Sequence, residues 1–256
     1  MKVMGIVNTT PDSFSDGGAY APLDHALRLC DEGADMVDIG GESTRPGAAE
    51  VSPREERQRV LPVIRALRAA RPALRLSIDT RRAEVARAAL EAGVHVVNDV
   101  SAGADPEMFP LCAEAGCGMV LVHMRGTPAT MQALAAYRDG CEEVWLELGE
   151  RATVARAAGV PEVWLDPGIG FAKTAAQSWA LLRDLPNHRD NTLLVGASRK
   201  SFLGLLPGAA TPADRLPGSL AVALWCRDAG AAVIRVHDVA ATRSALAAWA
   251  RLGESP

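Results

Sequence analysis

Residues 74–101 read LRLSIDTRRAEVARAALEAGVHVVNDVS, and two kinds of pattern alternate within this stretch. Leu74–Thr80 and His95–Ser101 are short runs rich in Val, Ile and Leu, whereas Ala83–Ala92 between them is amphipathic and rich in Ala and Arg. A short apolar run is typical of a buried strand, and an amphipathic run of this length is typical of a helix. The stretch therefore predicts one strand–helix–strand unit.

The same alternation recurs along the whole chain, at intervals of roughly 33 residues. The expected strands are mostly apolar, which indicates burial on both faces of a parallel sheet. They lie at Val3–Asn8, Met36–Gly41, Leu74–Thr80, His95–Ser101, Met119–Met124, Glu162–Gly168, Thr192–Ser198 and Ala231–Asp238. The helical candidates include Ala21–Ala34, Pro53–Ala70, Ala83–Ala92 and Met131–Ala158. Eight such units predict the α/β class and a single (β/α)8 TIM barrel. An open doubly wound sheet remains the alternative, because periodicity does not reveal whether a sheet closes.

Length and composition narrow the class of protein further. The chain has 256 residues, which suits one barrel domain over residues 1–256, and no Pro/Ser-rich linker divides it. Its net charge of −4 argues against a nucleic-acid partner, which usually requires a basic excess. No uncharged stretch approaches the roughly 20 apolar residues of a membrane span, and no signal peptide is visible. With five cysteines and no C-x-x-C pair, we expect reduced thiols and a cytoplasmic protein without membrane contact.

Nearly every expected strand ends in a polar or charged cluster at its C-terminal side. These clusters are Asn8–Thr10, Gly41–Arg45, Asp79–Thr80, Asn98–Asp99, His123–Arg125, Asp166–Gly168, Ser198–Ser201 and Arg235–Asp238. A single polar residue after a strand is more often a helix cap than a functional group. In a barrel, however, the carboxyl ends of all strands meet at one rim, where active sites are built. The sequence therefore predicts an enzymatic or ligand-binding site at this rim.

The polar residues of the rim fall into two chemical groups. One group suits a flat heterocycle rich in hydrogen-bond donors, because a carboxylate can accept two parallel bonds from its edge; it comprises Asp79, Asn98, Asp166 and Lys200. The other group suits the oxygens of a phosphate; it comprises Thr44, Arg45, Arg235 and His237. No G-x-x-x-x-G-K-[ST] or G-x-G-x-x-G motif is present, which argues against an ATPase or a dinucleotide-binding enzyme. The anion is therefore expected to be part of a small substrate.

Two loops rich in Gly, Pro and Ser follow the first two expected strands. They are Thr9–Gly18 and Ser43–Ala48. Loops of this composition at a barrel rim often close over the site. We expect both to fold over the substrates.

Nine segments in chain order make the sequence similar to the dihydropteroate synthase family. They are MGIVNTTPDSFSDGG (4–18), DIGGESTRPGA (38–48), SIDTRR (77–82), NDVSAG (98–103), HMRGTPATMQ (123–132), LDPGIGFAKT (165–174), VGASRKSFLG (195–204), RLPGSLAVAL (215–224) and RVHDV (235–239). The resemblance implies a TIM barrel, a homodimer and Mg²⁺. It also implies the condensation of 6-hydroxymethyl-7,8-dihydropterin pyrophosphate with 4-aminobenzoate, which gives dihydropteroate and pyrophosphate in folate biosynthesis.

Position by position, the resemblance assigns roles to individual residues. The pterin would be held by Asp79, Asn98, Asp166 and Lys200. The pyrophosphate would be held by Thr44, Arg45, Arg235 and His237. The aminobenzoate pocket would be lined by Pro46, Phe171 and Ser201, and the Mg²⁺ site would involve Asn8 and Asp16. Catalysis would rest on Asn8, Lys200, Arg235 and His237, with no protein nucleophile.

Two other functions remain open at this stage. A pterin-binding methyltransferase that uses methyltetrahydrofolate would share the pterin pocket, but it has no use for the anion group or for Ser43–Gly47. A non-catalytic pterin-binding homologue would retain the motifs without turnover. Pyrophosphate release discriminates between the synthase and both alternatives.

Overall fold

The computed structural model describes residues 1–10, 21–45 and 47–253. Its eight described strands are β1 Lys2–Asn8, β2 Met36–Gly40, β3 Arg75–Asp79, β4 Val96–Asp99, β5 Gly118–Val122, β6 Glu162–Asp166, β7 Leu194–Val195 and β8 Val233–Val236. All the paired strands run parallel, in the order β6-β5-β4-β3-β2-β1-β8-β7. A bridge between Leu165 and Leu193 joins the two ends of this sheet, and the amide of Leu165 donates to Thr192 O over 2.9 Å. The predicted barrel is therefore confirmed.

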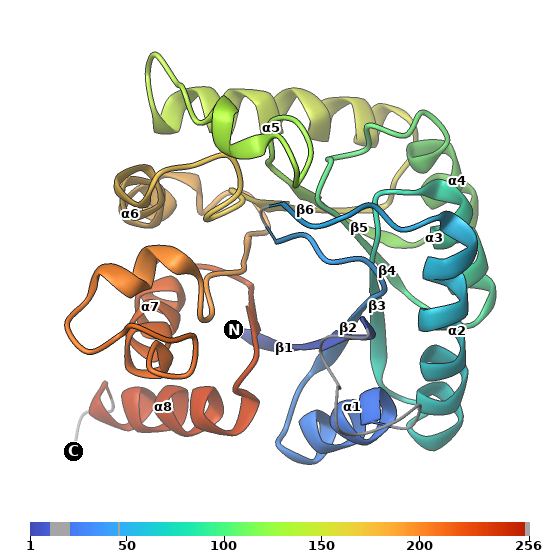
Figure 1. The fold of residues 1–256 in the computed structure, drawn as a ribbon, viewed down its shortest axis with the longest axis horizontal. Helices are drawn as coiled ribbons and strands as arrows, with labels where there is room; N and C mark the ends of the chain where they lie inside the picture. The colour runs from blue at the N-terminus through green and yellow to red at the C-terminus, as the bar shows by residue number, and fades with distance from the viewer. Residues whose placement is uncertain (11–20, 46, 254–256) are drawn as a thin grey trace.

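Helices surround the strands as an outer ring (Figure 1). They are α1 Ala21–Asp31, α2 Pro53–Ala70, α3 Ala83–Glu91, α4 Met108–Ala115, α5 Cys141–Ala157, α6 Ala175–Asp184, α7 Leu216–Asp228 and α8 Val239–Leu252. Three 3₁₀ turns complete the described elements: η3 Met131–Leu134, η4 Leu185–His188 and η5 Ser201–Leu205. Among the helices of the described ranges, none has the length and apolar character needed to cross a membrane.

Local sequence accounts for the helix starts that matter most to the architecture. Ser52 caps α2 by accepting a hydrogen bond from the amide of Glu55, and Pro53 occupies the first turn. Thr174 and Gln177 form a reciprocal capping box at the start of α6. These caps fix the residues at which α2 and α6 begin.

One predicted helix is wrong in its extent. Met131–Ala158 was expected to be continuous, but the structure divides it into η3 and α5, with residues 135–140 outside any helix. Gly140 adopts φ +58° immediately before α5. The carbonyl oxygens of Ala135 and Ala136 accept bonds from Gln177 and Arg125 instead of continuing a helical ladder. Tertiary contacts have therefore replaced helical ones in this segment.

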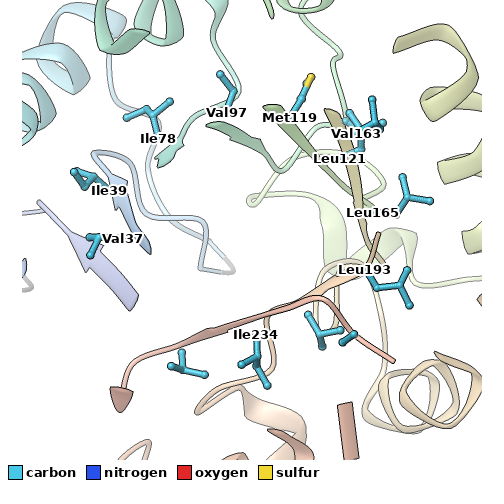
Figure 2. Packing of buried hydrophobic residues seen from close by; sticks show 14 of the residues in the cluster. Val37, Ile39, Ile78, Val97, Met119, Leu121, Val163, Leu165, Leu193 and Ile234 are labelled. Carbon is cyan, nitrogen blue, oxygen red and sulfur yellow. The ribbon is translucent and has the colours of Figure 1, made fainter. Parts of the chain in front are cut away.

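The alternation of side chains along each strand gives the barrel two separate cores. Ten labelled residues point outward against the helices (Figure 2): Val37, Ile39, Ile78, Val97, Met119, Leu121, Val163, Leu165, Leu193 and Ile234. A second buried cluster fills the barrel interior: Met4, Met36, Val96, Val120, Val122, Trp164, Leu194 and Val233. Successive residues of a strand face opposite sides of the sheet. The same alternation therefore turns Asp38, Asp79, Asn98, Asp166 and Arg235 toward the interior.

Candidate active site

A buried ion-pair network lies at the carboxyl ends of β2, β3, β4 and β8. The Arg235 guanidinium donates from Nε to Asp38 Oδ2 over 2.6 Å and from Nη2 to Asp79 Oδ2 over 2.7 Å. Asn98 Nδ2 donates to the same oxygen of Asp38 over 2.9 Å. Strand register explains this proximity, because Gly40, Asp79 and Asn98 are aligned across β2, β3 and β4. Gly40 leaves its own interior position open beside the Asp79 side chain.

Asp38 was missed as a candidate site residue by the reasoning from sequence. Its side chain is fully buried, and it holds both Arg235 and Asn98. The available signal was an acidic residue in the middle of an apolar strand, since an isolated buried carboxylate is costly without a partner. Asp38 was not predicted because it lies in the middle of a strand, and the predicted site residues were those at strand ends.

Three oxygen atoms inside the barrel are buried without a hydrogen-bond partner in the described part of the chain: Asp38 Oδ1, Ser77 Oγ and Asn98 Oδ1. Asp38 and Ser77 are paired in the β2–β3 register, so their side chains lie at one level below Asp79. Buried polar atoms normally have partners, and unpaired ones often mark functional sites. Two of the three are acceptors only, which fits a ligand that presents N–H groups.

Burial shifts the ionisation of the acidic residues. It raises the pKa of Asp79 to about 7, against the opposing effect of Arg235 and with help from the nearby Asp38 carboxylate. It also raises the pKa of Asp166, although Lys200 and the amide of Gly168 act in the other direction. The same desolvation lowers the pKa of Lys200 to about 8. A donor-rich ligand would stabilise the ionised carboxylates, so the site is electrostatically incomplete without one.

Asp166, Lys200 and Phe171 lie together at the ends of β6 and β7. The ammonium of Lys200 donates to Ile169 O and sits 4.2 Å from the centre of the Phe171 ring. The amide of Gly168 donates to Asp166 Oδ1 over 2.8 Å, which fixes the carboxylate at the strand end. Gly196 of the β7 strand end lies between Asp166 and Arg235, and a Cβ there would be 3.5 Å from Asp166 Oδ2. The two halves of the predicted heterocycle site are therefore adjacent.

His237 lies beside this network in a different environment. Its amide donates to Ser198 Oγ over 3.2 Å, and its Nδ1 lies 3.1 Å from the same hydroxyl. Burial and the neighbouring Arg235 lower the pKa of His237 to about 4, so the imidazole is neutral at pH 7. If the Ser198 hydroxyl donates to Nδ1, the Nε2–H group remains as a donor. His237 thus offers an N–H bond rather than a cation to an anion.

A cavity of about 620 Å³ adjoins His237, and its wall carries both arginines and acids. Arg28 pairs with Glu32 and Arg199 pairs with Asp238, and both acids also line the cavity. Asn8, Arg28, Arg45, Arg199 and His237 are among its lining residues. Arg45 is exposed and Thr44 is half-buried. The structure thus separates the predicted anion group, because Arg45 and His237 line this cavity while Arg235 is paired with the acids of the barrel interior.

Arg199 links the strand ends that carry Lys200 and His237. It donates from Nε to Asp238 Oδ2 over 2.8 Å and from Nη2 to Asp238 Oδ1. Its backbone adopts φ +57°, which is uncommon for a residue with a Cβ. The ion pair with Asp238 therefore stabilises the strained backbone of Arg199, and it connects the residue before Lys200 to the residue after His237.

The remaining candidates lie away from these networks or outside the described residues. Ser201 is exposed and begins η5, directly after Lys200. Pro46 and Asp16 lie outside the described ranges. A larger cavity of about 780 Å³ opens at the opposite end of the barrel, beside Arg75 and His95, and contains no predicted site residue. Its volume alone therefore does not make it a candidate active site.

The protein is similar to known proteins over nearly its whole length. The family model described as pterin binding enzyme matches residues 4–237. The dihydropteroate synthase of Synechocystis sp. is 47% identical, over 93% of this chain and 86% of the relative. A solved Xanthomonas albilineans dihydropteroate synthase with 4-aminobenzoic acid has a TM-score of 0.94 and 45% identity, and covers 100% of this chain and 94% of its own. A structure of the enzyme from the same organism in complex with 7,8-dihydropteroate has a TM-score of 0.89, at 42% identity and 100% coverage of this chain. Because the similarity extends over nearly the whole chain and over the barrel described above, the chain belongs to the pterin-binding enzyme family, among the dihydropteroate synthases.

Proposed function

We propose that this protein condenses 6-hydroxymethyl-7,8-dihydropterin pyrophosphate with 4-aminobenzoate, forming 7,8-dihydropteroate and pyrophosphate in folate biosynthesis. The observation that carries this proposal is the juxtaposition of buried acids in the barrel mouth with an adjoining cavity in which Arg45 and His237 can donate hydrogen bonds to an anion. An N–H-rich ring and an anionic leaving group on one substrate require both environments. A methyltransferase would need only the first.

The pterin would bind in the barrel mouth, with its N–H groups facing acceptors. Asp79 and Asp166 supply carboxylates, and Asn98 supplies an amide whose Oδ1 is buried without a partner. Lys200 would donate to a ring acceptor, exchanging its bond to Ile169 O for one to the ligand. These contacts orient the ring so that its methylene points toward His237.

The chemistry needs a stabilised leaving group and no covalent intermediate with the protein. The bond between the methylene carbon and the pyrophosphate oxygen breaks, and its electron pair leaves with pyrophosphate. The resulting cation is delocalised into the pterin ring beside the carboxylates. The amine lone pair of aminobenzoate forms the new C–N bond, and the nitrogen then loses a proton. Arg45 and His237 would stabilise the charge that develops on pyrophosphate, as preorganised donors. Thr44 and Arg235 would donate hydrogen bonds to the edge of the same pyrophosphate group.

Mg²⁺ is proposed as the metal, held with the pyrophosphate. Across the described ranges, no three His, Cys, Asp or Glu side chains form a metal-binding group. Mg²⁺ in phosphate-binding sites commonly keeps several waters and takes only one or two protein oxygens. Asn8 lines the same cavity as Arg45 and His237, so its amide oxygen fits such a ligand; Asp16 is the second proposed ligand. When bound, the ion would offset the charge of the leaving group.

The aminobenzoate would lie between Phe171 and the residues that follow Lys200. The Phe171 ring is half-buried at the edge of the barrel interior, where it packs against the second core. Ser201 is exposed at the start of η5, where its hydroxyl can bind a carboxylate. Pro46 would complete this pocket from the second loop.

A homodimer in a cytoplasm completes the proposal. Trp225 and Trp249 are 45% and 40% exposed, and Leu252 is 80% exposed. Trp249 donates to Asp228, which follows Trp225 by three residues on α7, and Leu252 follows Trp249 by three residues on α8. Residues three apart are neighbours on a helix surface, so the three exposed apolar side chains lie around Asp228 on the adjacent helices α7 and α8. Exposed aromatic patches of this kind are typical of protein interfaces, and we assign this one to a second copy of the chain.

The proposed activity is tested by measuring pyrophosphate release from the pterin pyrophosphate with and without 4-aminobenzoate and Mg²⁺. We expect release only when both are present, together with formation of dihydropteroate. No release, combined with tight pterin binding by calorimetry, would instead identify a non-catalytic pterin-binding protein. Methyl transfer from methyltetrahydrofolate serves as the assay for the remaining alternative.

A further inference from the structure

The loop between β6 and α6 is held by side chains from two other parts of the chain and by one of its own lysines. Three of its main-chain carbonyl groups each accept one hydrogen bond. Lys200 donates to Ile169 O, Lys173 donates to Phe171 O over 3.0 Å, and Tyr137 Oη donates to Ala172 O over 2.9 Å. Phe171 is therefore held by bonds to its own carbonyl and to that of its neighbour.

Lys173 is an unusual residue for this position because its side chain turns inward. The residue is only 4% exposed. Besides Phe171 O, its ammonium donates to His123 Nδ1 over 2.9 Å and lies 3.3 Å from His123 O. All three N–H groups of the ammonium thus have partners on the loop or on the residue that follows β5. A buried lysine costs considerable desolvation energy, so its retention here requires a gain elsewhere.

His123 connects Lys173 to an acidic residue on α5. Because Nδ1 accepts from Lys173, the ring proton lies on Nε2, which donates to Glu147 Oε2 over 2.8 Å. Burial and the Lys173 charge lower the pKa of His123 to about 4, so the ring stays neutral at pH 7. Glu147 and Glu143 also pair with Arg125. Burial lowers the pKa of Lys173 itself to about 7, and the Asp166 and Glu147 carboxylates act in the other direction. The network therefore places Arg125 and Lys173 beside two carboxylates and a neutral imidazole.

Backbone geometry shows that the loop needs this support. Ala172 adopts φ +48°, which costs free energy for any residue with a Cβ. Tyr137, which holds the Ala172 carbonyl, is fixed in turn by Arg125, whose guanidinium carbon lies 4.1 Å from its ring centre. Strained residues persist where their surroundings determine the conformation, and such residues cluster at functional sites.

We infer that Lys173 and Tyr137 are positioning residues that set the place of the Phe171 ring, and with it the affinity for the second substrate. The inference rests on the proposed function, because it takes the face of Phe171 as part of the aminobenzoate pocket. Neither residue needs to touch a substrate. Of the pterin-binding groups, Asp79 and Asn98 stand on β3 and β4, away from this loop, whereas Asp166 and Lys200 contact it.

Two substitutions test the inference independently. Lys173→Met keeps the length of the side chain and removes every donor. Tyr137→Phe keeps the ring over Arg125 and removes only the bond to Ala172 O. We expect the KM for 4-aminobenzoate to rise about tenfold in the first and about threefold in the second, as the loss of one or two net hydrogen bonds predicts. In Tyr137→Phe the Kd for the pterin pyrophosphate should change less than about twofold. Lys173→Met also removes a charge that acts on Asp166, so its pterin Kd is expected to rise as well. Lys2→Met, at the opposite end of the barrel, is the matched control and should leave both constants unchanged.

Hydrogen exchange supplies a readout that does not depend on turnover. The amide of Phe171 donates to Gly168 O over 2.9 Å, so the 168–174 segment should exchange faster in both variants than in the wild type. Exchange in β4 should stay unchanged. Wild-type exchange of the loop and wild-type KM for aminobenzoate in Tyr137→Phe would overturn the inference, even if Lys173→Met fails to fold. An inactive wild-type protein with faster loop exchange in the variants would overturn the proposed activity and leave the positioning role supported.

Discussion

Asp79 is the residue at which the electrostatics of the site can be tested most directly. It is 8% exposed and hydrogen-bonded to Arg235, and burial nevertheless raises its pKa to about 7. Below that pH the carboxyl group is protonated and has lost one of its two acceptor sites. A ligand that donates two hydrogen bonds requires the ionised form, so proton uptake competes with ligand binding.

We therefore expect the affinity for the pterin ring to fall as the pH is lowered through 7. The Kd should rise by up to about tenfold for each pH unit below the pKa of Asp79. Calorimetry with 6-hydroxymethylpterin between pH 5.5 and 8.5 measures this without interference from phosphate ionisation. Asp79→Asn should bind weakly at every pH, and any slope left in that variant belongs to Asp166 or to Lys200, whose pKa is lowered to about 8. A wild-type Kd that is constant from pH 6 to 8 would contradict this role of Asp79.

At the residue scale, the sequence indicates candidate residues at the ends of strands more readily than those in the middle of one. Asp79, Asn98, Asp166 and Lys200 were predicted because the strand ends of a barrel converge. The pairing of Arg235 with Asp38 depends on which residues share a level across four strands, and the register is not visible in a single sequence. The inward turn of Lys173 likewise depends on partners on β5 and α5 that are distant in the chain.

Gly168 shows how tightly the elements around β6 are packed. It adopts φ +67°, and a Cβ added to it would lie 1.9 Å from His123 O, a backbone atom that cannot move aside cheaply. The junction between β6 and its loop therefore lies against the end of β5. Only glycine fits this close approach without a shift of one strand end.

Gly168→Ala should accordingly destabilise the protein by about 3 kcal/mol, from backbone strain and overpacking together. Gly149→Ala is the matched control, because Gly149 lies within α5 and a Cβ there meets no atom within 4 Å. That variant should be more stable than the wild type by about 0.5–1 kcal/mol, since alanine favours a helix. Urea unfolding measures both changes, and equal midpoints for the two variants would refute the close approach.

Element boundaries were predictable only where the sequence itself ends an element. Pro53–Ala70 was predicted with the bounds that α2 has, because Ser52 and Pro53 mark its start. The break between η3 and α5 was not, since the bonds that replace the helix come from Arg125 and Gln177 in other elements. β7 is only two residues long, although Thr192–Ser198 reads as a full strand. Its expected C-terminal end instead forms the turns that present Lys200.

The whole molecule presents one surface whose role can be tested apart from catalysis. The patch of Trp225, Trp249 and Leu252 lies on α7 and α8, away from the barrel mouth. We expect sedimentation to show a dimer for the wild type and a shift to monomer for Leu252→Glu. Leu146→Glu replaces a comparably exposed leucine on α5 and should leave the dimer intact. A wild-type monomer at micromolar concentration, or a dimer lost equally in both variants, would remove this surface from the interface.

The overall architecture was the most predictable level, because eight repeats of one pattern leave few ways to bury every strand. Closure of the sheet was the part that periodicity could not supply. It depends on the contact of β6 with the residue before β7, two segments that do not differ in pattern from their neighbours. The barrel was therefore predicted over the open sheet from the length of the chain and from the number of strand–helix units, and the structure confirmed it.

That closure has a mechanical consequence. A single β-bridge joins β6 to the residue before β7, and we call this junction the seam of the barrel. Local opening should begin there, because the fewest backbone hydrogen bonds must break. This seam runs directly beneath Asp166 on one side and Lys200 on the other. A ligand bound by both Asp166 and Lys200 would link the two sides of the seam. Ligand binding would then rigidify the whole barrel as well as the pocket. The junction that opens most readily in the free protein would become the most rigid part of the complex.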